Sequence, residues 1–180
     1  MTALSTHQRG VLCGMAAGAV VAVVVVWGGA FVDLFGPFDN DLATRLSIAS
    51  GASLLPALCL MFALGRIAKH RFFHAVDIDG AGLSEGTPRV QLLRALAQNT
   101  HEQVMLAVVA YFAWVLLMPI GTLSAVVLAA IVFVLGRILF FAGYARGAPA
   151  RSLGFTACFY PTALMLATVA VMRALRWLFG

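Results

Sequence analysis

The sequence predicts an all-α membrane protein with five transmembrane helices. Of its 180 residues, 62% are hydrophobic and only 11% are charged, and the mean hydropathy is +0.98. A soluble chain of this length could not bury so much apolar surface. The apolar residues form continuous runs of about 20, which is the length of a helix that crosses a bilayer. Transmembrane β-strands would instead alternate apolar and polar residues.

Five apolar runs are the candidate helices, and they cover residues 10–34, 46–68, 92–118, 123–144 and 152–172. The first half of the third run is polar, whereas the first two runs and the last are clearly apolar. A short segment, Pro-Ile-Gly-Thr, separates the third run from the fourth. Consecutive elements joined by such a short connection are usually neighbours in space, so we expect an antiparallel hairpin.

The first run has two interpretations. Arg9 precedes it and small residues follow it, as in a cleaved secretory signal peptide. The apolar core of a signal peptide is about 7–15 residues long, however, and this run has the length of a membrane span. We therefore favour a retained helix, with cleavage as the alternative.

Basic residues gather in two of the loops, and the net charge is +5. The loop after the second run and its flanks carry Arg66, Lys69, Arg71, Arg89 and Arg94; the last loop carries Arg146 and Arg151. The first loop is acidic instead. Since Lys and Arg are enriched on the cytoplasmic side, we expect a bacterial inner-membrane protein with its N-terminus inside and its C-terminus outside. The basic residues would also touch anionic membrane lipid. No basic run extends into a soluble domain, so we expect no nucleic-acid partner.

The third run begins with a cluster of polar side chains. At 100° per residue, an arc narrower than half of the helix holds Arg94, Gln98, His101 and Glu102. Asn99 precedes Glu102 by three residues, a spacing at which two side chains touch. A carboxylate and a carboxamide are costly on a lipid-facing surface. We therefore expect these side chains to point into the bundle.

A second polar set follows at intervals of seven residues: Arg137, Tyr144 and Arg151. Seven residues are about two helical turns, so Arg137 and Tyr144 share one face. A guanidinium inside a membrane costs about 2.5–3.5 kcal/mol unless it meets a partner or water. Two explanations remain open. Glu102 neutralises an arginine on a neighbouring helix, or the arginines, which outnumber this carboxylate, bind an anionic ligand through their bidentate fork.

These motifs resemble the MAPEG family (membrane-associated proteins in eicosanoid and glutathione metabolism), which includes microsomal glutathione transferases, leukotriene C synthase and microsomal prostaglandin E synthase. The matching segments are NTHEQ, which follows an arginine, and GRILFFAGYARGAPARS. The resemblance implies a homotrimer of four-helix protomers, with glutathione bound between neighbouring subunits. It also implies a MAPEG-like four-helix domain at residues 42–180 and an added transmembrane helix with an acidic loop at residues 1–41.

The resemblance implies binding residues for glutathione as the co-substrate. Asn99 and Glu102 match the asparagine and glutamate that contact or organise the glutathione end of the family's site. Arg137 and Tyr144 match two glutathione ligands on the next helix. Arg94 stands one residue before the position at which several members have an arginine, and we include it among the binding residues.

The catalytic residues that the resemblance implies are Arg151, Tyr144 and Ser152. Arg151 matches the arginine proposed to stabilise the glutathione thiolate, and Ser152 matches a serine proposed to act on the thiol. A thiolate is the reactive nucleophile, and a nearby guanidinium favours the charged form. Phe140 stands where the leukotriene enzyme has a tyrosine that holds glutathione.

The sequence therefore predicts a glutathione-dependent transferase or peroxidase that acts on a small apolar electrophile or a lipid hydroperoxide. The alternative is a non-catalytic membrane binding or scaffold protein of the same fold. His70 and His74, followed by Asp77 and Asp79, resemble a fragment of a metal site. A membrane di-iron enzyme needs several further histidine clusters, so we predict no metal.

Overall fold

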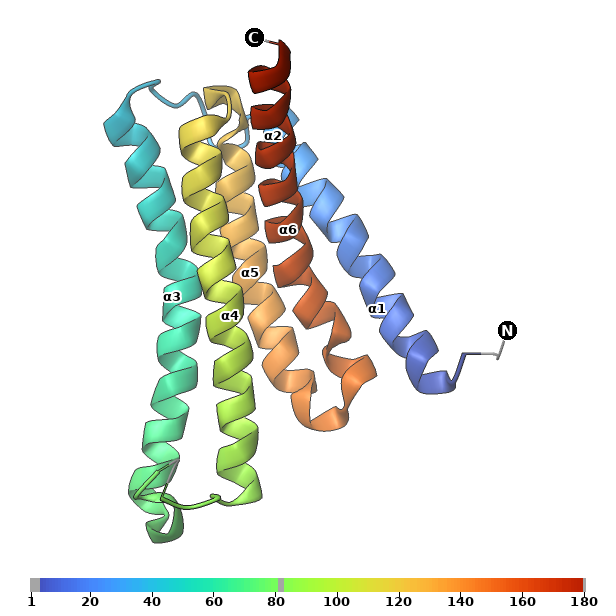
Figure 1. The fold of residues 1–180 in the computed structure, drawn as a ribbon, viewed down its shortest axis with the longest axis vertical. Coiled ribbons are helices and arrows are strands. Elements are labelled where there is room, and N and C mark those ends of the chain that lie inside the picture. The colour runs from blue at the N-terminus through green and yellow to red at the C-terminus, as the bar shows by residue number, and fades with distance from the viewer. Residues whose placement is uncertain (1–3, 81–82, 180) are drawn as a thin grey trace.

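The computed structural model describes residues 4–80 and 83–179, and five long helices account for most of them (Figure 1). In chain order the helices are α1 (Thr6–Val23), α2 (Gly29–Phe31), α3 (Leu42–Phe73), α4 (Pro88–Leu117), α5 (Ser124–Gly143) and α6 (Ala148–Phe179). A π-helical turn, Val24–Gly28, joins α1 to the short α2 without a break. Five helical segments are long and apolar enough to cross a membrane. The predicted all-α membrane fold is confirmed.

Two helices are longer than their apolar runs. Both α3 and α6 contain 32 residues, which corresponds to about 48 Å at 1.5 Å per residue. The hydrocarbon core of a bilayer is about 30 Å thick. The polar ends of both helices are therefore expected to extend beyond the hydrocarbon.

The four helices α3–α6 form a bundle, and α1 packs along the outside of α6 (Figure 1). The largest buried side chains include Trp114 and Tyr111 of α4 and Phe133 of α5. Trp114 also fixes the turn between α4 and α5, because its Nε1 donates to the carbonyl and the hydroxyl of Thr122, each at 3.1 Å. The two helices run antiparallel, as the short connection predicts.

The contact between α1 and α6 depends on glycine. Gly14 and Gly18 are buried, and a Cβ atom at either position would overlap Ser152 or Thr156 of α6. Thr156 Oγ1 donates to the Gly14 carbonyl at 3.0 Å, so a hydrogen bond also crosses this contact. Small residues let membrane helices approach closely, and here they let α1 pack against α6.

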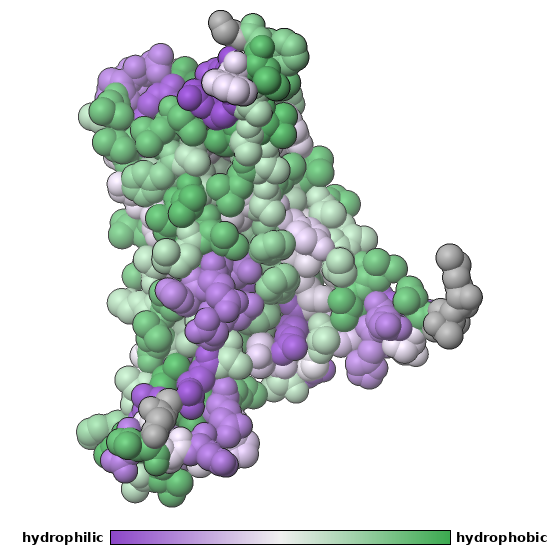
Figure 2. All heavy atoms as spheres, viewed as in Figure 1, coloured by the Kyte–Doolittle hydropathy of each residue, from purple (hydrophilic) through white to green (hydrophobic). Residues whose placement is uncertain are grey.

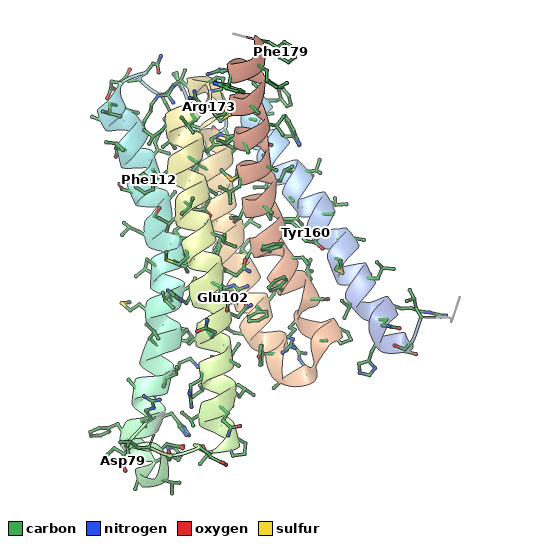
Figure 3. All side chains as sticks on the ribbon, in the orientation of Figure 1. Asp79, Glu102, Phe112, Tyr160, Arg173 and Phe179 are labelled. Carbon is green, nitrogen blue, oxygen red and sulfur yellow. The ribbon has the colours of Figure 1, made fainter. Side chains whose placement is uncertain are left out.

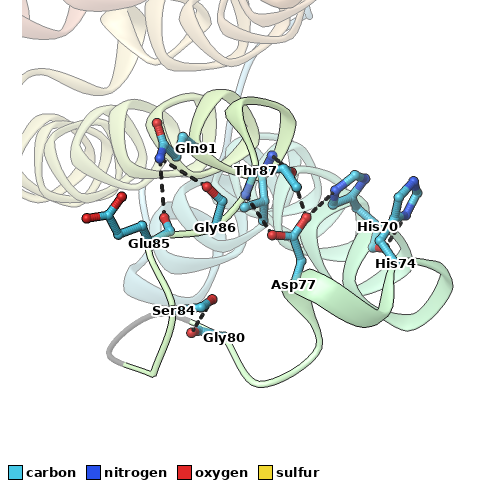
Figure 4. Close-up of polar contacts among 10 residues, drawn as sticks. His70, His74, Asp77, Gly80, Ser84, Glu85, Gly86, Thr87 and Gln91 are labelled. Carbon is cyan, nitrogen blue, oxygen red and sulfur yellow. Dashed lines mark hydrogen bonds and ion pairs between the residues drawn. The ribbon is translucent and has the colours of Figure 1, made fainter.

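The connection between α3 and α4 is organised by one buried carboxylate (Figure 4). Asp77 lies in a short 3₁₀ turn, Ala75–Asp77, and its side chain is buried. It accepts hydrogen bonds from the Thr87 amide at 2.7 Å and hydroxyl at 2.6 Å, and His70 Nε2 lies 2.8 Å away. Thr87 is in turn the N-cap of α4. The hydrogen bond from the Thr87 hydroxyl, followed by those from its amide and from His70, holds the pKa of Asp77 below its ordinary value of 3.8.

This connection should loosen in acid. Because the folded state lowers the pKa of Asp77, the stabilisation is complete above about pH 4 and is lost as the pH falls through the lowered value. We expect the protection of the amides of residues 74–80 and 83–87 against hydrogen exchange to fall below about pH 4. Asp77→Asn should exchange fast at every pH. Asp79→Asn changes an exposed carboxylate two residues away and should show the same pH dependence as the unmodified protein. If exchange protection in the unmodified protein did not depend on pH, Asp77 would not have this stabilising role.

Candidate functional site

A buried arginine joins three helices at the centre of the bundle. The Arg137 side chain, from α5, is only 1% exposed. Its Nη1 donates to Asn99 Oδ1 of α4 at 2.9 Å, and its Nε donates to Cys158 Sγ of α6 at 3.2 Å. The guanidinium also lies 4.4 Å from the ring centre of Phe140, at cation–π distance. These contacts supply some of the partners that an intramembrane arginine requires.

No carboxylate neutralises Arg137 within the part of the chain that the structure describes. The one ion pair found there is His70–Asp77, and Glu102 instead accepts a hydrogen bond from Gln98 Nε2 at 2.9 Å. Arg137 Nη2 is buried and has no hydrogen-bond partner among the described residues. The internal ion-pair network around Glu102 is therefore not formed in the single chain. The alternative explanation, that the arginines bind an anionic ligand, stays a prediction.

A pocket of about 390 Å³ lies next to this arginine, among α1, α4, α5 and α6. Its polar lining comes mainly from Asn99, Tyr144, Arg151 and Ser152. Its apolar lining includes Val11, Met15, Phe140, Phe155 and the ring of Tyr160; Figure 3 shows Tyr160 on α6, on the side that faces α1. The pocket thus joins a cationic end to a hydrophobic wall.

Arg151 is the charged group of this pocket. It lies in the first turn of α6, and its guanidinium carbon is 4.4 Å from the ring centre of Tyr144. Gly147, with φ of +96°, permits the sharp turn after Tyr144 that sets α6 against the end of α5. The half-buried guanidinium donates no hydrogen bond to any described residue. The N-terminal end of a helix adds partial positive charge, so this corner favours an anion.

Ser152 is less accessible than its neighbour. Its side chain is buried, its hydroxyl donates to the Pro149 carbonyl at 2.8 Å, and Gly14 of α1 lies directly against it. The hydroxyl lines the pocket but is already engaged. A new hydrogen bond from Ser152 to a ligand would therefore have to replace the bond to Pro149.

The predicted site residues fall into three groups. Asn99, Tyr144, Arg151 and Ser152 line the pocket together, and Arg137 lies behind Asn99 and Phe140 rather than in the lining. Arg94 and Glu102 form the third group, which is separate from this pocket. The structure thus brings together four of the predicted residues and places a fifth in direct support of them.

The expectation that the polar arc of α4 points into the bundle is wrong for the single chain. Arg94, Gln98, His101 and Glu102 are all exposed. The inner face of α4 is formed instead by the apolar residues Leu93, Leu96, Ala97 and Val104 and by two buried polar residues, Thr100 and Gln103. Glu102 lies about halfway along the molecule (Figure 3), where Figure 2 shows a hydrophilic patch beside hydrophobic side chains.

Two residues of the pocket and one partner of Arg137 carry no functional signal in the sequence. Val11 and Met15 look like ordinary apolar residues of a span, and only the docking of α1 against α6 brings them to the pocket. Cys158 looks like a small core residue, yet it accepts a hydrogen bond from Arg137 and donates to the Phe133 carbonyl at 3.3 Å. Phe140, a departure from the family pattern, packs on Arg137 and lines the pocket.

The comparison with protein families covers most of the bundle. The model of the MAPEG family matches residues 48–171, from within α3 to within α6, and so includes every predicted site residue. The helix α1 lies outside the matched region. No curated protein and no solved structure matches the chain. The matched region spans more than half of the sequence and has the helical membrane architecture of the family, so this integral membrane protein belongs to the MAPEG family.

Proposed function

We propose that this protein is a glutathione-dependent transferase or peroxidase that acts on a small apolar electrophile or a lipid hydroperoxide. Membership of the family supports glutathione chemistry. The observation that carries the proposal is the position of Arg151, which lines a partly hydrophobic pocket, packs over Tyr144 and meets no carboxylate there. A thiolate is an anion that suits this position.

The proposed chemistry begins with loss of the glutathione thiol proton to water. Arg151 stabilises the resulting thiolate by charge, and the Tyr144 hydroxyl is the nearby group suited to donate a hydrogen bond to the sulfur. In a transferase the sulfur forms a bond to an electrophilic carbon, and the electron pair of the bond that breaks at this carbon leaves with the displaced group, or remains on an opened epoxide oxygen or a conjugated acceptor that water then protonates. In a peroxidase the sulfur attacks the terminal oxygen of the hydroperoxide and becomes a sulfenic acid. The O–O bond breaks, and the other oxygen leaves as an alkoxide that takes a proton from water to give the alcohol. A second glutathione then converts the sulfenic acid to a disulfide and water.

The remaining glutathione groups call for the other predicted ligands. Arg137 occupies Asn99 Oδ1 and thereby leaves Asn99 Nδ2 to donate to a carboxylate or carbonyl of the ligand. Arg137 is thus a positioning residue in the single chain. Arg94 and Glu102, which are exposed on α4, carry the charges suited to a carboxylate and to the ammonium group.

We further propose that a second copy of the chain completes the site, in a homotrimer. The outward polar face of α4 supports this proposal, because Gln98 and Glu102 would otherwise face acyl chains halfway along a membrane-spanning helix. A neighbouring subunit that covers this face would remove that cost. It would also bring Arg94 and Glu102 to another pocket.

The second candidate function is a non-catalytic membrane binding or scaffold protein of the same fold. The engaged hydroxyl of Ser152 favours it, as does the separation of Arg94 and Glu102 from the pocket in the single chain. In that case the pocket would bind an apolar anion without activating a thiol. The two functions differ in whether bound glutathione becomes a thiolate.

The orientation in the membrane that we propose follows from the distribution of charged residues. The α3–α4 connection, the α5–α6 turn and the start of α1 lie towards the same end of the molecule (Figure 1). Eight of the 12 lysines and arginines lie in these segments or in the helix ends beside them, namely Arg9, Arg66, Lys69, Arg71, Arg89, Arg94, Arg146 and Arg151. The opposite end carries the aspartates of the first loop together with Arg45, Arg173 and Arg176. We propose that the basic end is cytoplasmic in a bacterial inner membrane, and that residues 1–41 are an addition to a family domain at 42–180.

Replacing Arg151 by Ala should abolish thiol activation. Purified protein mixed with glutathione should show the ultraviolet absorbance of a thiolate, and the signal should saturate with glutathione. The thiolate absorbance of the variant should be lower by a factor of about ten or more, since an adjacent opposite charge favours ionisation by at least that factor. Arg146→Ala is the matched control, because that exposed arginine donates only to the Ala142 carbonyl. Well-folded protein without any thiolate signal would leave the binding or scaffold function.

The proposed trimer predicts a mass of three chains in detergent, which light scattering corrected for bound detergent measures. Replacing both Gln98 and Glu102 by Leu should shift the mass towards one chain, because the outward face then becomes compatible with lipid. Met105→Leu changes an apolar residue on the same exposed side of α4 and should leave the trimer intact. A mass of one chain for the unmodified protein would refute the trimer.

The helix α1 should influence the choice of the second substrate. Met15 and Val11 line the apolar side of the pocket, whereas the polar groups that would hold glutathione lie on the other helices. Met15→Ala enlarges this side, so we expect kcat/KM to shift by about tenfold in favour of a bulkier acceptor, with an unchanged thiolate signal. Leu12→Ala, an exposed position on α1 outside the pocket, should have no effect. Equal changes in both variants would argue against this role.

A further inference from the structure

A second pocket, of about 420 Å³, lies between the C-terminal part of α3 and the N-terminal part of α4. Its cationic lining consists of Arg66 and Lys69 from α3 and Arg89 from α4. Its apolar lining includes Phe62, Phe73 and Leu93. It shares no lining residue with the pocket around Arg151, so it requires its own explanation.

The positive charge of this second pocket is not balanced from within. No carboxylate lines it, and Asp77 in the adjoining connection is already engaged by Thr87 and His70 (Figure 4). Arg66, Lys69 and Arg89 form neither an ion pair nor a hydrogen bond with another described residue. Three cationic groups thus share one cavity without an anion.

Aromatic side chains hold part of this arrangement in place. The Arg66 guanidinium lies 5.8 Å from the ring centre of Phe62 and 5.9 Å from that of Phe141 on α5, both at cation–π distance. The stacked rings of His70 and His74, with centres 3.9 Å apart, form a further part of the wall. The cavity is therefore bounded by ordered groups rather than by scattered surface lysines.

The apolar lining indicates an amphipathic occupant. Phe62 and Phe73 are 57% and 69% exposed, so their rings border the opening of the pocket. The pocket lies where the apolar run of α3 gives way to basic residues, which is the level expected for lipid headgroups. A small anion would contact the cations and leave the rings unused.

We propose that this pocket binds the phosphate headgroup of one anionic phospholipid from the surrounding bilayer. The cations meet the phosphate, and the glycerol and the first part of the acyl chains lie against Phe62 and Phe73. A zwitterionic headgroup would bring its own cation near three others and is disfavoured. Basic pockets between transmembrane helices bind such headgroups on the cytoplasmic side, where the charge distribution also places this end. The inference does not rest on glutathione chemistry.

The test uses the full chain in a neutral detergent and native mass spectrometry. Titration with phosphatidylglycerol should give one tightly retained lipid per chain, and phosphatidylcholine should not. The double variant Lys69→Gln/Arg89→Gln should bind phosphatidylglycerol about 25-fold more weakly, or about fivefold for each charge removed. Both side chains are exposed and form no hydrogen bond among the described residues, so the fold should persist. The matched control is Arg173→Gln/Arg176→Gln, which removes the same number of charges near the C-terminal end of α6, far from the pocket.

Further arms distinguish the possible anions. Glycerol phosphate, which has the headgroup without acyl chains, should compete poorly with the lipid, as should glutathione. Equal retention of the two lipids would overturn the proposal, as would equal weakening in both double variants. Displacement of the lipid by glycerol phosphate or by glutathione at comparable concentration would also overturn it, because the pocket would then be a site for soluble anions. Loss of the thiolate signal in the glutathione experiment would leave this result unaffected.

Discussion

The placement of one guanidinium inside the membrane constrains most of the architecture around it. Arg137 needs hydrogen-bond acceptors at a depth where water is scarce. It donates to Asn99 on α4 and to Cys158 on α6, and its guanidinium packs on the ring of Phe140. The contacts with Asn99 and Cys158 restrict how α4 and α6 are rotated relative to α5. The same contacts direct the free end of the Asn99 carboxamide and place Phe140 in the lining of the pocket. The requirement for satisfied polar groups in lipid therefore also shapes the candidate site.

The parts of this structure that the sequence predicts well are those with a strong local signal. Long apolar runs define five helices because a bilayer demands about 20 such residues for each span. The spacing of Arg137 and Tyr144 predicts that they share one face of a helix. The same spacing does not predict the contact of Arg151 with Tyr144, because Arg151 lies on the next helix and Gly147 lets the chain reverse between them. The bounds of α3 and α6 are less predictable, since hydropathy does not reveal polar helical ends that extend beyond the lipid.

What the sequence does not predict depends on which helices meet. The polar arc of α4 is evident from its spacing, but its direction depends on neighbours, and Glu102 faces away from the bundle of its own chain. Likewise, nothing local distinguishes Met15 from any other apolar residue of a span. It becomes a pocket residue because Gly14 and Gly18 let α1 approach α6. Such information resides in pairs of distant residues, and a single sequence does not show those pairs.

The pairing of α1 with α6 also has a consequence for the order of assembly. The helix α1 ends at Val23 and α6 begins only at Ala148, and chains are synthesised from the N-terminus at about 5–20 residues per second. The wall formed by Val11 and Met15 can close against α6 only when that helix has left the ribosome and entered the bilayer. Until then Gly14 and Gly18 cannot contact α6, so α1 is a separate transmembrane helix in the bilayer. The pocket is therefore complete only after α6 has entered the bilayer, so a nascent chain that lacks α6 does not present the finished cavity.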